Sequence, residues 1–126
     1  METMKHKDLT GKIINCAYKV HTVLGFGFLE NVYQNALVHE LQKAGLEVQK
    51  EQPIQVLYDG QVVGDFAADI VVAGSIIVEL KSIQTLHPAH QAQVSNYLKA
   101  TGVEVGLLIN FGQELDIKRV VNSTPA

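Results

Sequence analysis

The sequence lacks most of the features that mark secreted, membrane or dedicated nucleic-acid-binding proteins. Cys16 is the one cysteine in 126 residues, which excludes an internal disulfide. No apolar run approaches the ~20 residues that cross a bilayer. Residues 1–7 have no apolar core of the kind found in a signal peptide. We therefore expect a cytoplasmic protein with no membrane partner.

An excess of basic residues is also missing. The chain has 10 Lys and Arg against 13 Asp and Glu, for a net charge of -3. Autonomous nucleic-acid-binding domains are usually basic, so this balance disfavours tight binding through surface charge alone. A bound cation would offset part of the acidic charge. No glycine-rich stretch is followed by Gly-Lys-Ser/Thr, which excludes a P-loop.

The composition is that of a globular protein. Hydrophobic residues make up 47% of the chain, which indicates a packed core rather than disorder. The length suits one domain over residues 1–126, and we expect frayed tails at 1–7 and 122–126.

Apolar residues at three- and four-residue steps predict three helices. The first is capped by Asp8 or Thr10 and ends at Gly25. The second runs from about residue 29 to 44, and the third from about 88 to 101. These helices supply apolar faces that can cover a sheet.

Short β-branched runs separated by turn residues predict five strands, at about 47–57, 61–72, 76–82, 105–111 and 115–121. The helix at 88–101 connects the third and fourth strands, so these two should be parallel. The other neighbours should be antiparallel. The expected fold class is α/β (mixed α+β), with a mixed four- to five-stranded sheet flanked by helices.

Three charged residues interrupt the apolar strands at 66–72 and 76–82: Asp69, Glu79 and Lys81. Charges inside buried strands are costly unless they are paired or bind a metal. Glu79 and Lys81 share a face because side chains alternate along a strand. A three-residue loop at 73–75 would place Asp69 opposite Glu79, whereas a two-residue loop would send Asp69 to the other face.

Two close carboxylates favour a divalent cation between them, and hard oxygen ligands select magnesium, manganese or calcium. A neighbouring lysine can orient a water or stabilise developing negative charge. The alternative is an ion pair on a solvent-facing sheet, which contributes only ~0–1 kcal/mol. The apolar residues around Asp69, Glu79 and Lys81 favour the metal site.

Asp69 followed by Glu79-Leu80-Lys81 matches the D…ExK pattern of the PD-(D/E)XK nuclease superfamily. Residues 27–33 read GxxExxY, residues 93–97 read QxxxY, and residues 106–112 read GLLINFG. Together these stretches resemble the GxxExxY proteins, a bacterial and archaeal group within that superfamily. The resemblance covers nearly the whole chain, and it implies a restriction-endonuclease-like core.

The resemblance also implies roles for individual residues. Asp69, Glu79 and the backbone carbonyl of Leu80 would bind Mg²⁺, with Mn²⁺ as an alternative. Lys81 would position the attacking water, and Glu30 would contact the metal through water. Gln93 and Tyr97, which share a helix face, would approach the substrate phosphate or brace the site. The implied catalytic set is therefore Asp69, Glu79, Lys81, Glu30, Gln93 and Tyr97.

The implied reaction is metal-dependent hydrolysis of phosphodiester bonds in DNA or RNA. A domain of this size has little surface for gripping a duplex, since specific DNA interfaces usually bury ~1,000 Å² or more of protein. We therefore expect a homodimer or a partner protein. Two alternatives remain: a noncatalytic nuclease-fold binding or scaffold module acting with a partner, and a hydrolase of another phosphoester such as a nucleotide.

Overall fold

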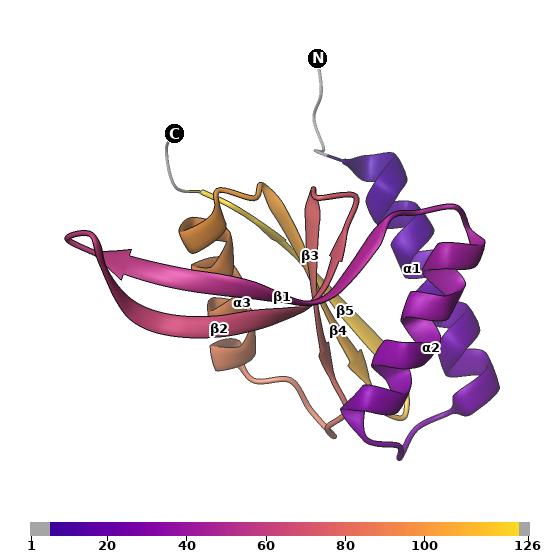
Figure 1. Cartoon of the computed structure of the whole chain (residues 1–126). Coiled ribbons are helices and arrows are strands. Elements are labelled where there is room, and N and C mark those ends of the chain that lie inside the picture. Colours follow the sequence, from indigo (N-terminus) through magenta and orange to yellow (C-terminus); the bar gives the residue numbers. More distant parts are fainter. Residues whose placement is uncertain (1–5, 124–126) are drawn as a thin grey trace.

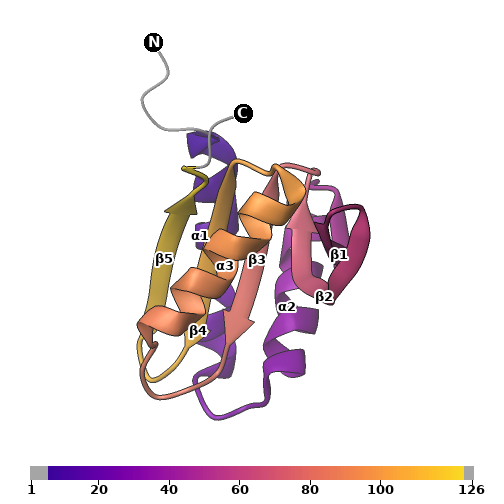
Figure 2. The same cartoon turned by 90° about the vertical axis from the view of Figure 1, so that its left-hand side faces the viewer.

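The computed structural model describes residues 6–123 as three layers (Figures 1 and 2). Helices α1 (Lys7–Leu24) and α2 (Glu30–Lys43) cover one face of a sheet, and α3 (Pro88–Thr101) crosses the other face. Within the described part of the chain, no helix is both long enough and apolar enough to cross a membrane. The layered arrangement confirms the predicted fold class.

The sheet has five strands in chain order: β1 (Val48–Tyr58), β2 (Gln61–Val72), β3 (Ile76–Lys81), β4 (Val105–Phe111) and β5 (Leu115–Val121). The β3–β4 pair is parallel and the other three pairs are antiparallel, as the helical connection predicts. Every residue of β4 and all but the last residue of β3 are buried, because helices cover both faces of the sheet.

Two tight turns set the register of the first three strands. Asp59 and Gly60 both have positive φ angles, 53° and 78°, and join β1 to β2 as a two-residue turn. Figure 1 shows this hairpin extending beyond α3. Val72 pairs with Ile76, so the β2–β3 connection is the predicted three-residue loop.

Each face of the sheet has its own core. Ile70, Val72, Val78 and Leu80 pack with α1 and α2. On the opposite face, a second core includes residues of β3, β4 and α3. Gly106 lets α3 approach β4 closely, because a Cβ there would lie 2.7 Å from Cγ1 of Val94. The position of α3 therefore depends on a glycine.

The first helix begins earlier than predicted. Its N-cap is His6, and Asp8 and Thr10 both lie inside the helix, so neither caps it. The Thr10 hydroxyl instead donates to the Lys7 carbonyl at 3.0 Å. A Ser or Thr side chain that bonds back to the preceding turn is satisfied within a helix, which is why this residue gave a false capping signal.

The frayed tails predicted at 1–7 and 122–126 fall partly outside the described residues, which exclude 1–5 and 124–126. Inside the described part, Lys7 is helical. The backbone N–H of Asn122 donates to the Glu104 carbonyl at 2.8 Å. The fraying of the two tails stays a prediction.

Candidate active site

Strand β2 changes face at Asp69. The β1–β2 pairing omits one pair, Glu51 with Asp69, and Glu51 has a left-handed φ of 55°. Ile70 packs in the core under α1 and α2, whereas Ala68 packs in the core under α3. Regular alternation would put Ala68 and Ile70 on the same face. The strand therefore turns over at Asp69, where its backbone leaves the regular ladder.

Asp69 and Glu79 meet where β2 and β3 part. The last regular pair between the two strands, counted from the loop, is Ile70 with Val78. Beyond that pair, the Asp69 N–H donates to Glu79 Oε2 at 2.8 Å, and the Leu80 N–H donates to Asp69 Oδ2 at 2.8 Å. Each carboxylate thus bonds to the backbone of the opposite strand. The predicted convergence of the two acids is confirmed as geometry.

Both carboxyl groups are held in an environment that disfavours their charge. Glu79 is 5% exposed, and burial, followed by the charge of Asp69, raises its pKa to about 8. Burial also raises the pKa of Asp69, and the charges of Glu30 and Glu51 add to this rise. A solvent-facing ion pair does not fit a buried Glu79. The pair gains most from a nearby positive charge.

Lys81 and Glu30 lie near the pair without touching it. Burial is the largest cause of the raised pKa of both carboxyl groups. The charge of half-buried Lys81 lowers the pKa of each acid, and the charge of exposed Glu30 raises it. Across residues 6–123, the structure shows no direct ion pair between Lys81 and either acid. Both residues act on the pair through space.

Tyr33 holds the loop that places Glu30. Its buried hydroxyl donates to the Gly25 carbonyl at 2.8 Å and accepts the Phe28 N–H at 3.3 Å. Its ring stacks on Phe111 with centroids 4.5 Å apart. The Ser82 hydroxyl donates to the Phe28 carbonyl at 2.6 Å, which ties the same loop to the end of β3. This gives the tyrosine of the GxxExxY stretch a structural role.

Tyr97 on α3 lies close enough to the acids to feel their charge, and Gln93 lies beside it on the same helix. The Tyr97 side chain is 6% exposed and lies against the Phe66 ring, with centroids 5.7 Å apart. Burial, then the charges of Glu79 and Asp69, raise the pKa of its hydroxyl. Gln93 lies one turn earlier and lines the same cleft as Tyr97. The predicted common face of these two residues is confirmed, and their chemical roles stay predictions.

Gln34 is a site neighbour that the sequence reasoning missed. It is 8% exposed, and its Nε2 donates to the Asp69 carbonyl at 2.9 Å and to Glu51 Oε2 at 2.6 Å. It therefore fills the gap in the β1–β2 ladder. Its position four residues after Glu30 and three before buried Leu37 was a usable signal, because that spacing shares a helix face. The left-handed backbone of Glu51 has no comparable signal.

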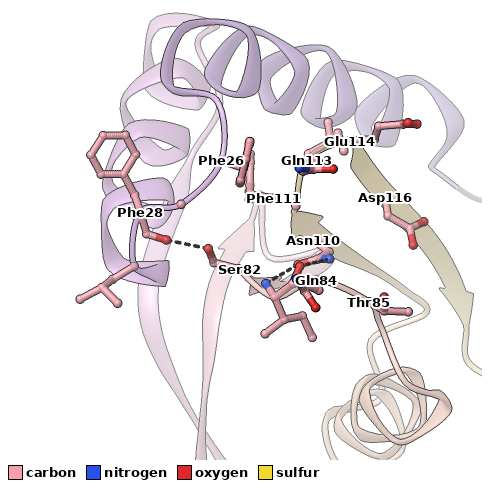
Figure 3. A pocket seen from close by; sticks show the side chains of 15 residues that line it. Phe26, Phe28, Ser82, Gln84, Thr85, Asn110, Phe111, Gln113, Glu114 and Asp116 are labelled. Atoms are coloured by element: carbon pink, nitrogen blue, oxygen red, sulfur yellow. Dashed lines mark hydrogen bonds between the residues drawn. The ribbon is translucent and has the colours of Figure 1, made fainter.

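A polar cleft of about 810 Å³, here called the loop cleft, lies on one side of the site. It is lined by residues 26–29, 82–85 and 110–116. The Ile83 N–H donates to Asn110 Oδ1 at 3.0 Å, and Asn110 Nδ2 donates to the Ile83 carbonyl at 2.9 Å. Dashed lines at Asn110 mark these bonds in Figure 3. Glu114 and Asp116 make this cleft acidic.

A second cleft of about 750 Å³, here called the α3 groove, lies between the β1–β2 hairpin and α3. Its lining residues are Gln55, Val56, Leu57, Phe66, Ala89, Ala92, Gln93, Asn96, Tyr97, Lys99 and Ala100. Neither cleft is lined by Asp69 or Glu79, but each is lined by close neighbours of the acids.

The acid pair fits a hard divalent cation. Over residues 6–123, no group of three or more His, Cys, Asp or Glu is close enough to hold a metal. Each carboxylate uses one oxygen to accept a backbone N–H, and no donor in this range bonds the other oxygen of Asp69 or Glu79. Mg²⁺ is commonly bound by one or two carboxylates together with waters and substrate phosphates. Half-buried Asp69 and buried Glu79 are therefore a sufficient protein contribution.

Comparison with solved structures identifies the same fold. SSO0001 has a TM-score of 0.59 at 18% identity over 75% of this chain, and the match spans about half, 52%, of that protein. The alkaline exonuclease LHK-Exo from Laribacter hongkongensis has a TM-score of 0.55 at 10% identity, with 98% of this chain and 73% of that chain covered. None of the curated proteins matches the sequence.

The sequence also matches a family model. The model describes the PD-(D/E)XK nuclease superfamily and covers residues 7–120. Nucleases of this superfamily generally use divalent metal ions. The match includes both strands that carry Asp69 and Glu79 and the helix that carries Tyr97. The chain therefore belongs to the PD-(D/E)XK nuclease superfamily.

Proposed function

We propose that this chain hydrolyses phosphodiester bonds in DNA or RNA with a divalent cation, Mg²⁺ or Mn²⁺, bound by Asp69 and Glu79. The observation that carries the proposal is the reciprocal bonding of half-buried Asp69 and buried Glu79 at the point where β2 and β3 part. Membership of the nuclease superfamily gives that arrangement its chemical context.

Each residue has a distinct proposed task. When bound, the cation supplies Lewis-acid activation of a water and neutralises charge on the phosphate. Asp69 and Glu79 would hold it through the oxygens that accept no backbone N–H, with the Leu80 carbonyl as the third proposed ligand. The Lys81 ammonium orients the attacking water and stabilises developing negative charge.

Three further residues act around this centre. Glu30 would contact the cation through a water, and its charge already acts on both acids. Gln93 and Tyr97 face the substrate phosphate from α3. The Tyr97 hydroxyl is protonated at neutral pH, as in an ordinary tyrosine, and the upward shift of its pKa reinforces this, so it can donate a hydrogen bond.

A metal-dependent nuclease assay tests the proposal. We expect Asp69→Asn and Lys81→Ala each to cleave DNA or RNA at least ~100-fold more slowly than the wild type, since each removes a few kcal/mol of transition-state stabilisation. Asp65→Asn is the matched control, because it changes an exposed acid on the same strand. Equal cleavage by all four proteins would exclude catalysis at this site.

A noncatalytic binding or scaffold module is the second candidate. It is favoured by the absence of a three-residue acidic group within the described range and by the net charge of -3. A ligand that binds the native state raises its stability. Thermal melting with and without Mg²⁺ or Mn²⁺ separates the candidates: the nuclease is stabilised by the cation through Asp69 and Glu79, and the scaffold is not.

We also propose the finer assignments that the sequence suggested. The first is membership of the GxxExxY group of the superfamily, which is supported by the GxxExxY pattern at residues 27–33 and by the structural role of Tyr33 in that stretch. The small surface implies a homodimer or a partner protein that helps to hold the substrate. Sedimentation with and without nucleic acid would show whether the chain forms a homodimer. With Cys16 as its one cysteine, the chain suits a reducing cytoplasm.

A further inference from the structure

The α3 groove contains an aromatic surface beside the acid pair. Phe66 is 46% exposed, although it is a large apolar side chain, and its ring lies at 44° to that of Tyr97. The Tyr97 ring is buried behind it. An accessible ring supported by a second ring is a surface on which a flat apolar group can stack.

The polar groups of the groove are amides. Gln55, Gln93 and Asn96 line it, and Lys99 is the one charged residue among its lining residues. An amide offers both donors and an acceptor, which suits the edges of nucleobases. A volume of about 750 Å³ is ample for one base with its sugar. The groove therefore combines stacking with hydrogen bonding and carries no negative charge.

Tyr97 places the groove beside the proposed catalytic site. Phe66 precedes Asp69 by three residues on β2, which is ~10 Å along an extended strand. Tyr97 lies in the groove and also close enough to both acids for their charges to affect its hydroxyl. A base in the groove would belong to a nucleotide next to the phosphate at Asp69 and Glu79.

The other cleft is a poor match for the same strand. Glu114 and Asp116 line the loop cleft, and although Lys118 pairs with Asp116 at 3.6 Å, the lining includes no basic residue, so the carboxylate of Glu114 would repel phosphates. The difference in charge between the two clefts therefore favours the α3 groove.

We propose that the α3 groove binds an unpaired nucleobase, so that the preferred substrate is a single strand or a strand end rather than an intact duplex. The proposal rests on the nuclease function proposed above. Base–aromatic stacking on Phe66 supplies affinity with little dependence on sequence, and the amide of Asn96 holds the base edge.

Binding of a short fluorescent DNA strand, and of RNA of the same sequence, tests the proposal. Phe66→Ala should weaken binding about tenfold, the value expected for one stacked base. Phe66→Tyr keeps the ring and should bind like the wild type. Phe26→Ala is the matched control, because it removes an exposed aromatic from the loop cleft. Binding of a blunt duplex should not depend on Phe66.

A scan with abasic sites makes the test specific. Removing one base near the scissile phosphate should weaken wild-type binding by about the same factor as Phe66→Ala and should add nothing to that variant. Asn96→Ala is a second variant. Asn96 is exposed on α3, so the substitution should not affect folding, and it should weaken strand binding about threefold to tenfold. Far-ultraviolet circular dichroism checks that each variant is folded.

The proposal is overturned if Phe66→Ala, Asn96→Ala and the abasic scan all leave wild-type affinity unchanged. It is also overturned if Phe66→Ala alters the oligomeric state and leaves strand binding unchanged, since the groove would then be a protein interface. Neither result affects metal-dependent cleavage by Asp69 and Glu79. Conversely, cleavage unaffected by Asp69→Asn rejects the nuclease site, whereas the binding data still decide the groove.

Discussion

Asp69 and Glu79 each accept a hydrogen bond from the other's strand, and this exchange replaces the ladder that regular strands would continue. The arrangement fixes one oxygen of each acid and keeps the other available. Burial makes their charge unfavourable without a cation. The metal-free site therefore carries an unfavourable electrostatic free energy, which cation binding would remove.

The raised pKa of Glu79 predicts a pH dependence of stability in the metal-free protein. Its folded pKa of about 8 lies above the ordinary value of 4.5, so the folded state retains a proton that the unfolded state loses. This contribution is full below pH 4.5 and is lost as the pH rises through about 8. Urea unfolding in EDTA should show stability falling over this window.

Glu79→Gln is the comparison for that measurement, because it removes the titrating group and keeps the shape. We expect the difference in stability between variant and wild type to grow with pH, reaching about 1–3 kcal/mol in favour of the variant at alkaline pH. Two parallel pH profiles would contradict the shift.

Gln34 positions Asp69 through its backbone. Gln34→Met keeps the volume but leaves the Asp69 carbonyl and the Glu51 carboxylate without their donor. We expect a loss of about 1–3 kcal/mol in the free energy of unfolding and slower cleavage with little change in KM, because Asp69 shifts. Gln42→Met, an exposed position on the same helix, is the control. Identical behaviour of the two variants in denaturation and kinetics would remove this role.

At the scale of elements, α3 is placed by its contact with β4. Gly106→Ala would bring a Cβ to 2.7 Å from Val94 and 3.3 Å from the Ile77 carbonyl. Because a β-branched side chain cannot easily move away, we expect about 1–3 kcal/mol of destabilisation and weaker strand binding, since Gln93 and Tyr97 move with the helix.

Gly11→Ala is the matched control for Gly106→Ala. Gly11 lies within α1 and an added Cβ would meet nothing within 4 Å, so the substitution should stabilise by about 0.5–1 kcal/mol. Chemical denaturation measures both variants. A neutral Gly106→Ala would show that α3 is held by other contacts.

The elements themselves were accessible from the sequence. Asp59-Gly60 and the loop at 73–75 set the register, and Pro88 and Gly102 bound α3 as predicted. These signals are local, which is why they are readable. The reversal of β2 at Asp69 was not readable, since it depends on Gln34 reaching the strand from a helix 35 residues away in the chain.

The same limit explains what the sequence predicted for the site. The three-residue loop implied that Asp69 and Glu79 converge, and they do. A regular strand would also have put Ala68 and Ile70 on one face, but they pack in different cores. The burial of Glu79 and the two clefts depend on long-range packing, which no local pattern encodes.

At the scale of the whole molecule, a chain with a net charge of -3 must hold a polyanion without a strongly basic surface. We expect the cation to supply much of the attraction. Affinity for a phosphorothioate strand, which resists cleavage, should fall at least about tenfold in EDTA. Glu79→Gln in Mg²⁺ should resemble the wild type in EDTA. Equal wild-type affinity with and without Mg²⁺ would mean that protein groups alone hold the strand.

The most direct test of the central claim is a crystal structure of the protein soaked in Mn²⁺, examined for anomalous scattering. The claim is that Asp69 and Glu79 jointly bind a divalent cation. It predicts one peak within roughly 2–2.5 Å of a carboxylate oxygen from each residue, absent in Asp69→Asn crystals soaked in the same way. A soaked wild-type crystal with no peak between these two carboxylates would contradict it.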